Sequence, residues 1–264
     1  MKIGFIGCGN MATAMLKGIL KSGEVKNADM IASAKSDKTR EKIEKELGIQ
    51  KADTNAQVVD FADVVFLAVK PQFLEEVLDE IKDNVKEGQI FISIAPGKTL
   101  QWLGEHLGEG IKIIRTMPNT PAMVGEGMTA LCVNEQVTEQ ETLLAVTLCN
   151  TFGKTEVIPE HLMDAVVGVS GSSPAYVFMF LEAMADAAVA DGMPRAQAYK
   201  FAAQAVLGSA KLMLETGKHP GELKDMVCSP AGTTIQAVRV LEEKGLRSAV
   251  IEAQLECVKK AKGM

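Results

Sequence analysis

Histidine and paired cysteine are scarce in this sequence, which leaves few side chains able to ligate a metal. The chain has 3 histidines and 5 cysteines. The cysteines form no CxxC pair, and no histidine has a Cys, His or Asp partner at metal-ligand spacing. The sequence therefore predicts no metal site and no redox dithiol. An odd number of scattered cysteines is typical of reduced thiols in a cytoplasmic protein.

Basic residues are also fewer than acidic ones, 28 against 34, which gives a formal net charge of -6 at pH 7. Proteins that bind nucleic-acid backbones need clustered Lys and Arg, so we expect no nucleic-acid partner. The N-terminus lacks the charged region and cleavage site of a signal peptide. By our reading no apolar run reaches the length of a membrane span. We therefore predict a soluble, cytoplasmic protein with no membrane partner.

The composition is that of a globular protein with room for two domains. The chain has 264 residues, of which 47% are hydrophobic and 23% are charged. Residues 1–160 alternate short apolar runs with amphipathic stretches, the pattern of a parallel sheet covered by helices. Residues 161–264 are rich in Ala, Met and Leu. We predict an α/β N-terminal domain with a Rossmann-type doubly wound sheet (1–160), followed by an all-α C-terminal domain (161–264).

Apolar runs and Gly or Pro punctuation place the individual elements. Ser36 is expected to cap a charged helix that ends near Gly48. Strands are expected at residues 2–6, 30–32, 64–69, 90–94, 111–115, 128–133 and 155–158. Helices of the second half are expected at residues 173–191, 194–216, 220–226, 231–244 and 247–262.

The stretch 175–189 is apolar on nearly every side, with Glu182 and Asp186 as its charged residues. Such a helix must be buried all round. Burial against a second copy of the chain is the interpretation we favour, since a small domain offers little cover. A central helix surrounded by its own neighbours is the alternative.

A glycine-rich turn directly follows the first expected strand. It has the G-x-G-x-x-A form of the dinucleotide fingerprint and leads into a helix that ends at Ser22. Glycines permit the tight turn and the close approach of a pyrophosphate, and the helix N-terminus offers free N–H groups to the anion. The cofactor-binding candidates here are Gly7, Gly9, Asn10, Met11 and Ala12.

The residues after the second strand select between the two nicotinamide cofactors. A carboxylate at this point would bond the ribose hydroxyl of NAD, but the segment reads Ser-Ala-Lys-Ser from Ser33 to Ser36. The hydroxyl of Ser33 and the cation of Lys35 suit a 2′-phosphate, so NADPH is favoured, with weaker use of NADH. The alternative is a polar loop that binds nothing.

Three further segments follow expected strands and so reach the carboxyl edge of the sheet, where ligands of doubly wound folds bind. Small residues at 93–97 leave room for a nicotinamide ring, or form a simple turn. The loop 115–121 either forms one side of the cofactor pocket or only connects the sheet to the remainder of the chain. The candidates at this edge are Ala68, Val69, Lys70, Pro71, Ala95 and Gly97.

Two segments of the helical half place small and hydroxyl residues before a helix. They span 168–176 and 228–234. Backbone N–H groups, hydroxyls and the positive end of a helix suit a small carboxylate, although ordinary capped helices look similar.

The sequences Gly-Ser-Ser-Pro-Ala-Tyr (171–176) and Ser-Pro-Ala-Gly-Thr-Thr (229–234) closely resemble the paired signatures of pyrroline-5-carboxylate reductases. The other motifs follow in that family's order along essentially the whole chain. The resemblance implies reduction of L-pyrroline-5-carboxylate to L-proline, and an intertwined homodimer, often assembled into rings, in which the partner subunit supplies the substrate loop. Ala231 departs from the pattern, since many members have glycine there.

The resemblance also implies residue roles. Asn55 would meet the adenine-side ribose, and the substrate carboxylate and ring nitrogen would be held by Ser229, Gly232, Thr233 and Thr234. Thr234 is the catalytic candidate, as a hydrogen-bond partner of the ring nitrogen. A protonated imine is already electrophilic, so the protein mainly has to orient it against the hydride donor, and no strong general acid is needed.

Two other functions fit parts of the sequence. A β-hydroxyacid dehydrogenase shares the domain order but needs a lysine on the first long helix, where this chain has Tyr176, Val177 and Phe178. A non-catalytic NADP-binding regulator would keep the fold and lose the pocket, but the segment 229–234 is intact.

Overall fold

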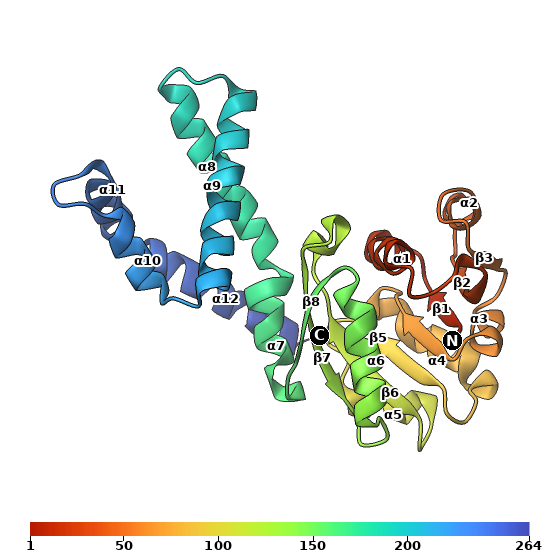
Figure 1. Ribbon diagram of the computed structural model, residues 1–264. Helices are drawn as coiled ribbons and strands as arrows, with labels where there is room; N and C mark the ends of the chain where they lie inside the picture. The colour runs from red at the N-terminus through yellow and green to blue at the C-terminus, as the bar shows by residue number, and fades with distance from the viewer. Residues whose placement is uncertain (264) are drawn as a thin grey trace. The chain divides into compact units, whose positions relative to one another are not determined.

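The computed structural model describes residues 1–263 and contains an eight-stranded sheet in the order β3-β2-β1-β4-β5-β6-β7-β8 (Figure 1). The pairing of β6 with β7 is antiparallel, and the other pairings are parallel. The strands are β1 (Ile3–Ile6), β2 (Met30–Ser33), β3 (Gln50–Ala52), β4 (Val64–Leu67), β5 (Ile90–Ser93), β6 (Lys112–Met117), β7 (Gly127–Val133) and β8 (Gly153–Val157).

All seven strands expected from the sequence are present, and the doubly wound α/β prediction is confirmed. Strands β1, β2, β4 and β5 are buried along their whole length, as strands covered by helices on both faces must be. The sequence patterns did not predict β3, which lies at the edge of the sheet. Its three residues are Gln-Lys-Ala, which carry no β-branched or aromatic signal.

Helices of the first half cover the two faces of the sheet. They are α1 (Asn10–Ser22), α2 (Asp37–Lys45), α3 (Asn55–Phe61), α4 (Leu74–Ile81), α5 (Leu100–Leu107) and α6 (Glu139–Asn150), with α7 (Met163–Val166) after the last strand. Ser36 caps α2 as expected, since its hydroxyl accepts the N–H of Thr39.

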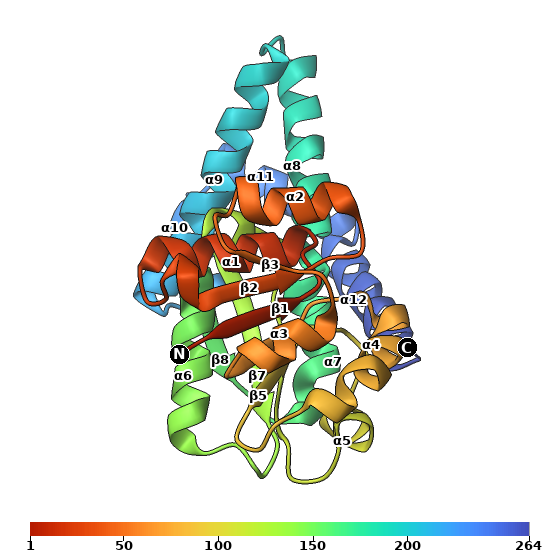
Figure 2. The same ribbon diagram turned by 90° about the vertical axis from the view of Figure 1, so that its right-hand side faces the viewer.

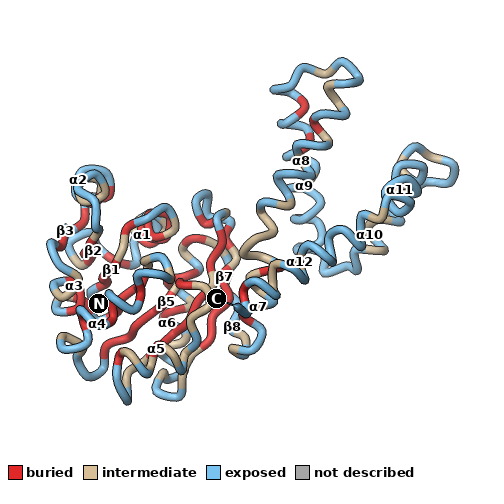
Figure 3. The backbone as a smooth tube through the Cα atoms, turned by 180° about the vertical axis from the view of Figure 1, so that it is seen from behind, coloured by how far each residue is buried: buried red, intermediate tan, exposed pale blue. Residues whose placement is uncertain are grey.

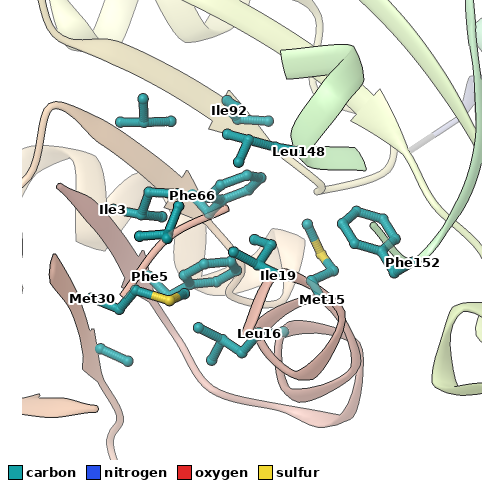
Figure 4. Close-up of a cluster of buried hydrophobic side chains, with 14 of the residues drawn as sticks. Ile3, Phe5, Met15, Leu16, Ile19, Met30, Phe66, Ile92, Leu148 and Phe152 are labelled. Atoms are coloured by element: carbon teal, nitrogen blue, oxygen red, sulfur yellow. The ribbon is translucent and has the colours of Figure 1, made fainter. Parts of the chain in front are cut away.

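Each face of the sheet has its own hydrophobic cluster, with α1 and α3 on opposite sides of β1 (Figure 2). On one face Met15 and Ile19 of α1 pack with Phe5 and Phe66, whose rings stack with centroids 4.5 Å apart (Figure 4). On the other face α3, α4 and α5 pack against β4 and β5. These two layers fix the carboxyl edge of the sheet, where the candidate residues lie.

The remaining helices agree with the expected ranges to within about two residues. They are α8 (Ser173–Ala190), α9 (Arg195–Thr216), α10 (Pro220–Val227), α11 (Thr233–Glu243) and α12 (Leu246–Lys262). By compactness the chain divides into a first unit, Met1–Ser172 with Cys257–Met264, and a second unit, Ser173–Glu256. This division falls later than residue 160, because the segment after β8 packs against the sheet through Met163. The boundary at 160 remains a prediction.

Helix α8 is not buried all round within one chain. Ala185 is its buried residue, whereas Phe178 is 65% and Met179 is 70% exposed. Figure 3 shows the same contrast between the red strands and the largely pale blue helices α8 to α11. Burial by neighbours of the same chain, the alternative left open by the sequence, is therefore wrong.

Within residues 1–263 one helical stretch, Glu160–Ala190, is long and apolar enough by length and composition to cross a membrane. The expectation that no apolar run reaches this length was wrong. Glycines and Pro174 suggested a break there, but a π-helical turn at Val167–Gly171 joins α7 almost directly to α8. The core helices of soluble proteins pass the same test, so this stretch is weak evidence of a membrane span.

Candidate functional site

Gly7 begins the tight turn between β1 and α1, and two constraints require glycine there. Its φ is +93°, a conformation that residues with a side chain rarely adopt. A Cβ atom at this position would also lie 2.7 Å from the carbonyl oxygen of Ala68. The N–H of Gly7 donates to the carbonyl of Ser33 over 3.2 Å, which ties the turn to the end of β2.

Gly9 is the N-cap of α1 and faces open space. A Cβ atom there would meet nothing within 4 Å among residues 1–263. The first turn of α1 contains Asn10, Met11 and the buried Ala12 but no acid, so its N–H groups and the helix dipole favour an anion. The turn therefore fits the pyrophosphate of a dinucleotide: the space that a side chain would fill lies over a helix N-terminus.

A cleft of about 390 Å³ separates this turn from α2. Lys38, Lys42 and Lys45 line it from α2, and Nζ of Lys42 lies 3.4 Å from Oγ1 of Thr13. These lysines were not among the predicted site residues, although their spacing of four and three residues puts them on one face of a helix. Burial raises the pKa of the Cys8 thiol in this cleft, and Lys42 acts in the opposite direction.

At the end of β2 the side chain of Ser33 is directed to the protein and not to solvent. Ser33 is 4% exposed, and its hydroxyl donates to Oδ1 of Asn55 over 2.6 Å. Lys35 is exposed, with Nζ 5.2 Å from the ring centroid of Phe73. Of the two residues expected to hold a 2′-phosphate, Ser33 therefore has its hydroxyl bonded within the protein. Lys35 keeps its ammonium group at the surface.

Asn55 is the first residue of α3 and lies beside the end of β2. Its Nδ2 donates to Oε2 of Glu80 over 2.7 Å, and its backbone N–H donates to Oε1 over 3.2 Å. Glu80 was not among the predicted site residues. No local signal marks this residue, because the contact joins two helices that are separated by β4 in the chain.

The ends of β4 and β5 contribute the remaining cofactor candidates. Ala68 and Val69 are half-buried, whereas Lys70 is exposed and precedes a short helical turn that begins at Pro71. After β5, Ala95 is 2% exposed and Gly97 has a φ of +77°. The structure therefore brings all the predicted cofactor residues to the carboxyl edge of one sheet.

The loop after β6 has a bracing role through Asn119. The amide of Asn119 donates to the carbonyl of Ser170 over 3.0 Å and accepts the N–H of Met128 over 2.8 Å. Because Asn119 is 8% exposed, both bonds are largely shielded from water. The loop thus joins β7 to the π-helical turn at Val167–Gly171.

The segment 168–176 is not the free helix N-terminus expected from its serines. Helical structure continues from α7 through the π-helical turn to α8, so few of its N–H groups are left for a ligand. Ser172 instead accepts a hydrogen bond from the thiol of Cys257 over 3.2 Å. The expectation was wrong for this segment because a π-helical turn at Val167–Gly171 continues the helix where the sequence indicated a break.

The segment 228–234 does form a turn before a helix. The N–H of Gly232 donates to the carbonyl of Ser229 over 3.0 Å, and Ala231 has a φ of +57°. A Cβ atom at Gly232 would lie 2.3 Å from Oγ of Ser229 and 3.1 Å from its carbonyl oxygen, so a larger residue here would force the Ser229 side chain to turn away. Gly232 is the N-cap of α11, and Thr233 and Thr234 are its first two residues.

The predicted residues therefore form two groups on different units. The cofactor candidates lie on the first unit, and the substrate candidates lie at the N-terminus of α11 on the second unit. Among residues 1–263 no three His, Cys, Asp or Glu side chains come together as possible metal ligands.

Two family models match the two halves of the chain. Residues 160–264 match the model described as pyrroline-5-carboxylate reductase dimerisation. Residues 2–97 match the model described as NADP oxidoreductase, coenzyme F420-dependent. The helical half thus corresponds to a dimerisation domain, and the first half corresponds to a nucleotide-binding domain.

Named relatives are similar over nearly the whole length. The chain is 55% identical to the pyrroline-5-carboxylate reductase of Escherichia coli, covering 98% of this chain and 97% of that protein. A pyrroline-5-carboxylate reductase structure from Coxiella burnetii is 35% identical with a TM-score of 0.92, covering 99% and 97% of the two chains. A Plasmodium falciparum pyrroline carboxylate reductase solved with NADP bound is 29% identical with a TM-score of 0.89, covering 100% and 97%.

Proposed function

The chain belongs to the pyrroline-5-carboxylate reductase family, and on that premise we propose how its residues perform the reaction. The activity is the reduction of L-pyrroline-5-carboxylate to L-proline, the last step of proline biosynthesis. The main support for this activity is the 55% identity over 98% of the chain, a range that spans both helical signatures. A nicotinamide cofactor supplies the hydride that reduces the imine carbon.

Cofactor binding is assigned to the edge of the sheet. The N–H groups of Asn10, Met11 and Ala12 would hold the pyrophosphate of the cofactor, and the absence of a side chain at Gly9 would leave room for it. NADPH is the preferred cofactor, because Lys35, and Lys38 and Lys42 of α2, offer cations to its additional phosphate, whereas Lys45 is paired with Glu41. NADH is used less well. The small residues Ala95 and Gly97 leave room for the nicotinamide ring.

Substrate binding is assigned to the turn at 229–234. Backbone N–H groups at the start of α11 and the hydroxyls of Ser229 and Thr233 hold the carboxylate. The hydroxyl of Thr234 orients the ring nitrogen. Since the protonated imine is already electrophilic, positioning is the main contribution of the protein. The reaction adds a hydride to carbon and converts the iminium to an amine, so it requires no strong acid at the site.

The active form is a homodimer or a ring of such dimers. Phe178 and Met179 expose apolar surface along α8, and a groove of about 490 Å³ between α11 and α12 is lined by Leu241, Val250 and Ile251 among others. A second copy of the chain covers these surfaces. The substrate turn of one subunit then faces the cofactor-binding unit of its partner. A cytoplasmic location agrees with five free cysteines.

Turnover tests the proposed function directly. The purified protein should oxidise NADPH when pyrroline-5-carboxylate is supplied and not when it is omitted, with proline as the product. Absence of turnover with both NADPH and NADH would contradict the assignment. Light scattering should give the mass of a dimer or a multiple of it, and an active monomer would refute the dimer.

A further inference from the structure

Three side chains form a continuous hydrogen-bonded row at the end of β2. The hydroxyl of Ser33 donates to Oδ1 of Asn55 over 2.6 Å, and Nδ2 of Asn55 donates to Oε2 of Glu80 over 2.7 Å. Oε1 of Glu80 accepts the backbone N–H of Asn55 over 3.2 Å. Both carboxylate oxygens of Glu80 are thus committed to Asn55.

This row determines which way round the amide of Asn55 lies. An ionised carboxylate only accepts hydrogen bonds, so the amide nitrogen must face Glu80. The carbonyl oxygen must then face Ser33, and the hydroxyl of Ser33 donates a hydrogen bond to it. The assignment of nitrogen and oxygen in Asn55 follows from the chemistry of its two neighbours.

The carbonyl of Asn55 faces the end of β2, because its Oδ1 accepts the hydroxyl of Ser33. Ser33 ends β2, and its own carbonyl accepts the N–H of Gly7 in the glycine-rich turn over 3.2 Å. In doubly wound folds this position lies next to the adenine-side ribose. Ser33 is 4% exposed, whereas Asn55 is only half-buried, so Asn55 is the more accessible of the two.

A carbonyl at this position discriminates between the two cofactors. It would accept a hydrogen bond from the 2′-hydroxyl of NADH, but it would repel the 2′-phosphate of NADPH. Lys35 acts in the opposite direction. The Asn55 carbonyl and the Lys35 ammonium group would therefore favour different cofactors.

We propose that Glu80 is a positioning residue for cofactor choice, because it holds the carbonyl of Asn55 toward the ribose and so preserves the use of NADH. This inference rests on the proposed function for the identity of the cofactor. The rival role is purely structural: Glu80 accepts the first N–H of α3 and would stabilise that helix without affecting cofactor choice.

Glu80→Gln separates the two roles. A glutamine amide both donates and accepts, so Asn55 is free to turn over and present its NH₂ group to the ribose. The ratio of the dissociation constants, Kd for NADH over Kd for NADPH, is measured by fluorescence titration. We expect it to rise about fivefold to tenfold, the effect of one hydrogen bond. The ratio of kcat/KM for the two cofactors should move in the same direction.

Two further variants make the test specific. Asp79→Asn removes one negative charge from α4 without touching Asn55, since Asp79 pairs with Lys82, and it should leave the ratio unchanged. Asn55→Ala deletes the carbonyl and should weaken NADH binding more than NADPH binding, even if Glu80→Gln folds poorly.

The opposite results would overturn the inference. Equal weakening of both cofactors by Glu80→Gln with a lowered Tm identifies a helix cap, and a shift of the ratio by Asp79→Asn identifies a general charge effect. Failure of the unmodified protein to turn over would count against the proposed function alone, because the binding ratios are read without substrate.

Discussion

Nη1 of Arg115 lies 3.0 Å from Oε1 of Glu160, and the same oxygen accepts the backbone N–H of Leu100 over 2.7 Å. The side chain of Arg115 is 7% exposed and that of Glu160 is 32% exposed, so water screens this pair only in part. The contact joins β6 to the first residue of α5 and to the segment that follows β8.

Glu160→Gln should lower the free energy of unfolding by about 2 kcal/mol, because it leaves the buried guanidinium of Arg115 without an opposite charge. Urea unfolding measures the change. The control is Glu41→Gln in the exposed pair of Glu41 with Lys45, which should cost less than about 0.5 kcal/mol. Equal effects would show that burial of Arg115 is not what matters.

Alanine substitutions of the two glycines in the cofactor turn should affect different properties, NADPH binding for Gly9 and stability for Gly7. Gly9→Ala adds a methyl group where the protein has open space, so it should weaken NADPH binding about tenfold or more at a stability cost below about 1 kcal/mol. Gly7→Ala should cost about 2 kcal/mol or more, because its φ is positive and its Cβ would meet Ala68. Thermal unfolding and NADPH titration distinguish them, and the reverse pattern would exclude Gly9 from the pyrophosphate site.

Thr234→Val should lower kcat/KM for the imine about tenfold to a hundredfold, the loss of a hydrogen bond of about 1.5–3 kcal/mol to a charged ligand. Affinity for NADPH and the Tm should hardly change. Thr234 is the second residue of α11, and the N-cap is Gly232. A fall in Tm without a fall in kcat/KM would make Thr234 structural.

Ala231→Gly should stabilise the protein by about 0.5–1 kcal/mol, because the left-handed φ of +57° strains a residue with a Cβ. Denaturant unfolding tests this. The matched change Ala249→Gly, in the interior of α12, should cost about 1 kcal/mol. Destabilisation by both changes would mean that Ala231 is not strained.

Burial raises the pKa of the Cys149 thiol from its ordinary 9.0 to about 12. Its folded-state pKa thus lies above its unfolded value, so the folded state retains the proton longer. The contribution to stability is complete below pH 9 and is lost as the pH rises towards 12, with a slope of up to about 1.4 kcal/mol per pH unit. Unfolding curves of Cys149→Ala, which begins less stable, should decline less steeply above pH 9 than those of the unmodified protein. A matching slope in both proteins would show that other groups dominate.

Local patterns in the sequence were sufficient for much of this protein. Apolar runs located the strands other than β3, and Gly or Pro punctuation located the long helices, because both signals act within a few residues. The fingerprint at Gly7 and Gly9 predicted the cofactor turn for the same reason: the conformation and the free helix amides are properties of one short segment. The family signatures at 171–176 and 229–234 predicted the reaction.

Only the tertiary structure decided the contacts between distant segments. Sequence reasoning assigned Ser33 to a phosphate, but folding places Asn55 beside it and Glu80 beyond, which commits the hydroxyl of Ser33 to a neighbour. It also predicted a free helix N-terminus at 168–176. In the structure the helix is continuous through this segment, and Asn119 donates a hydrogen bond to the carbonyl of Ser170. Hydrogen-bond partners depend on which elements the sheet brings together, and that pairing is set by the burial of the whole core and by no single segment.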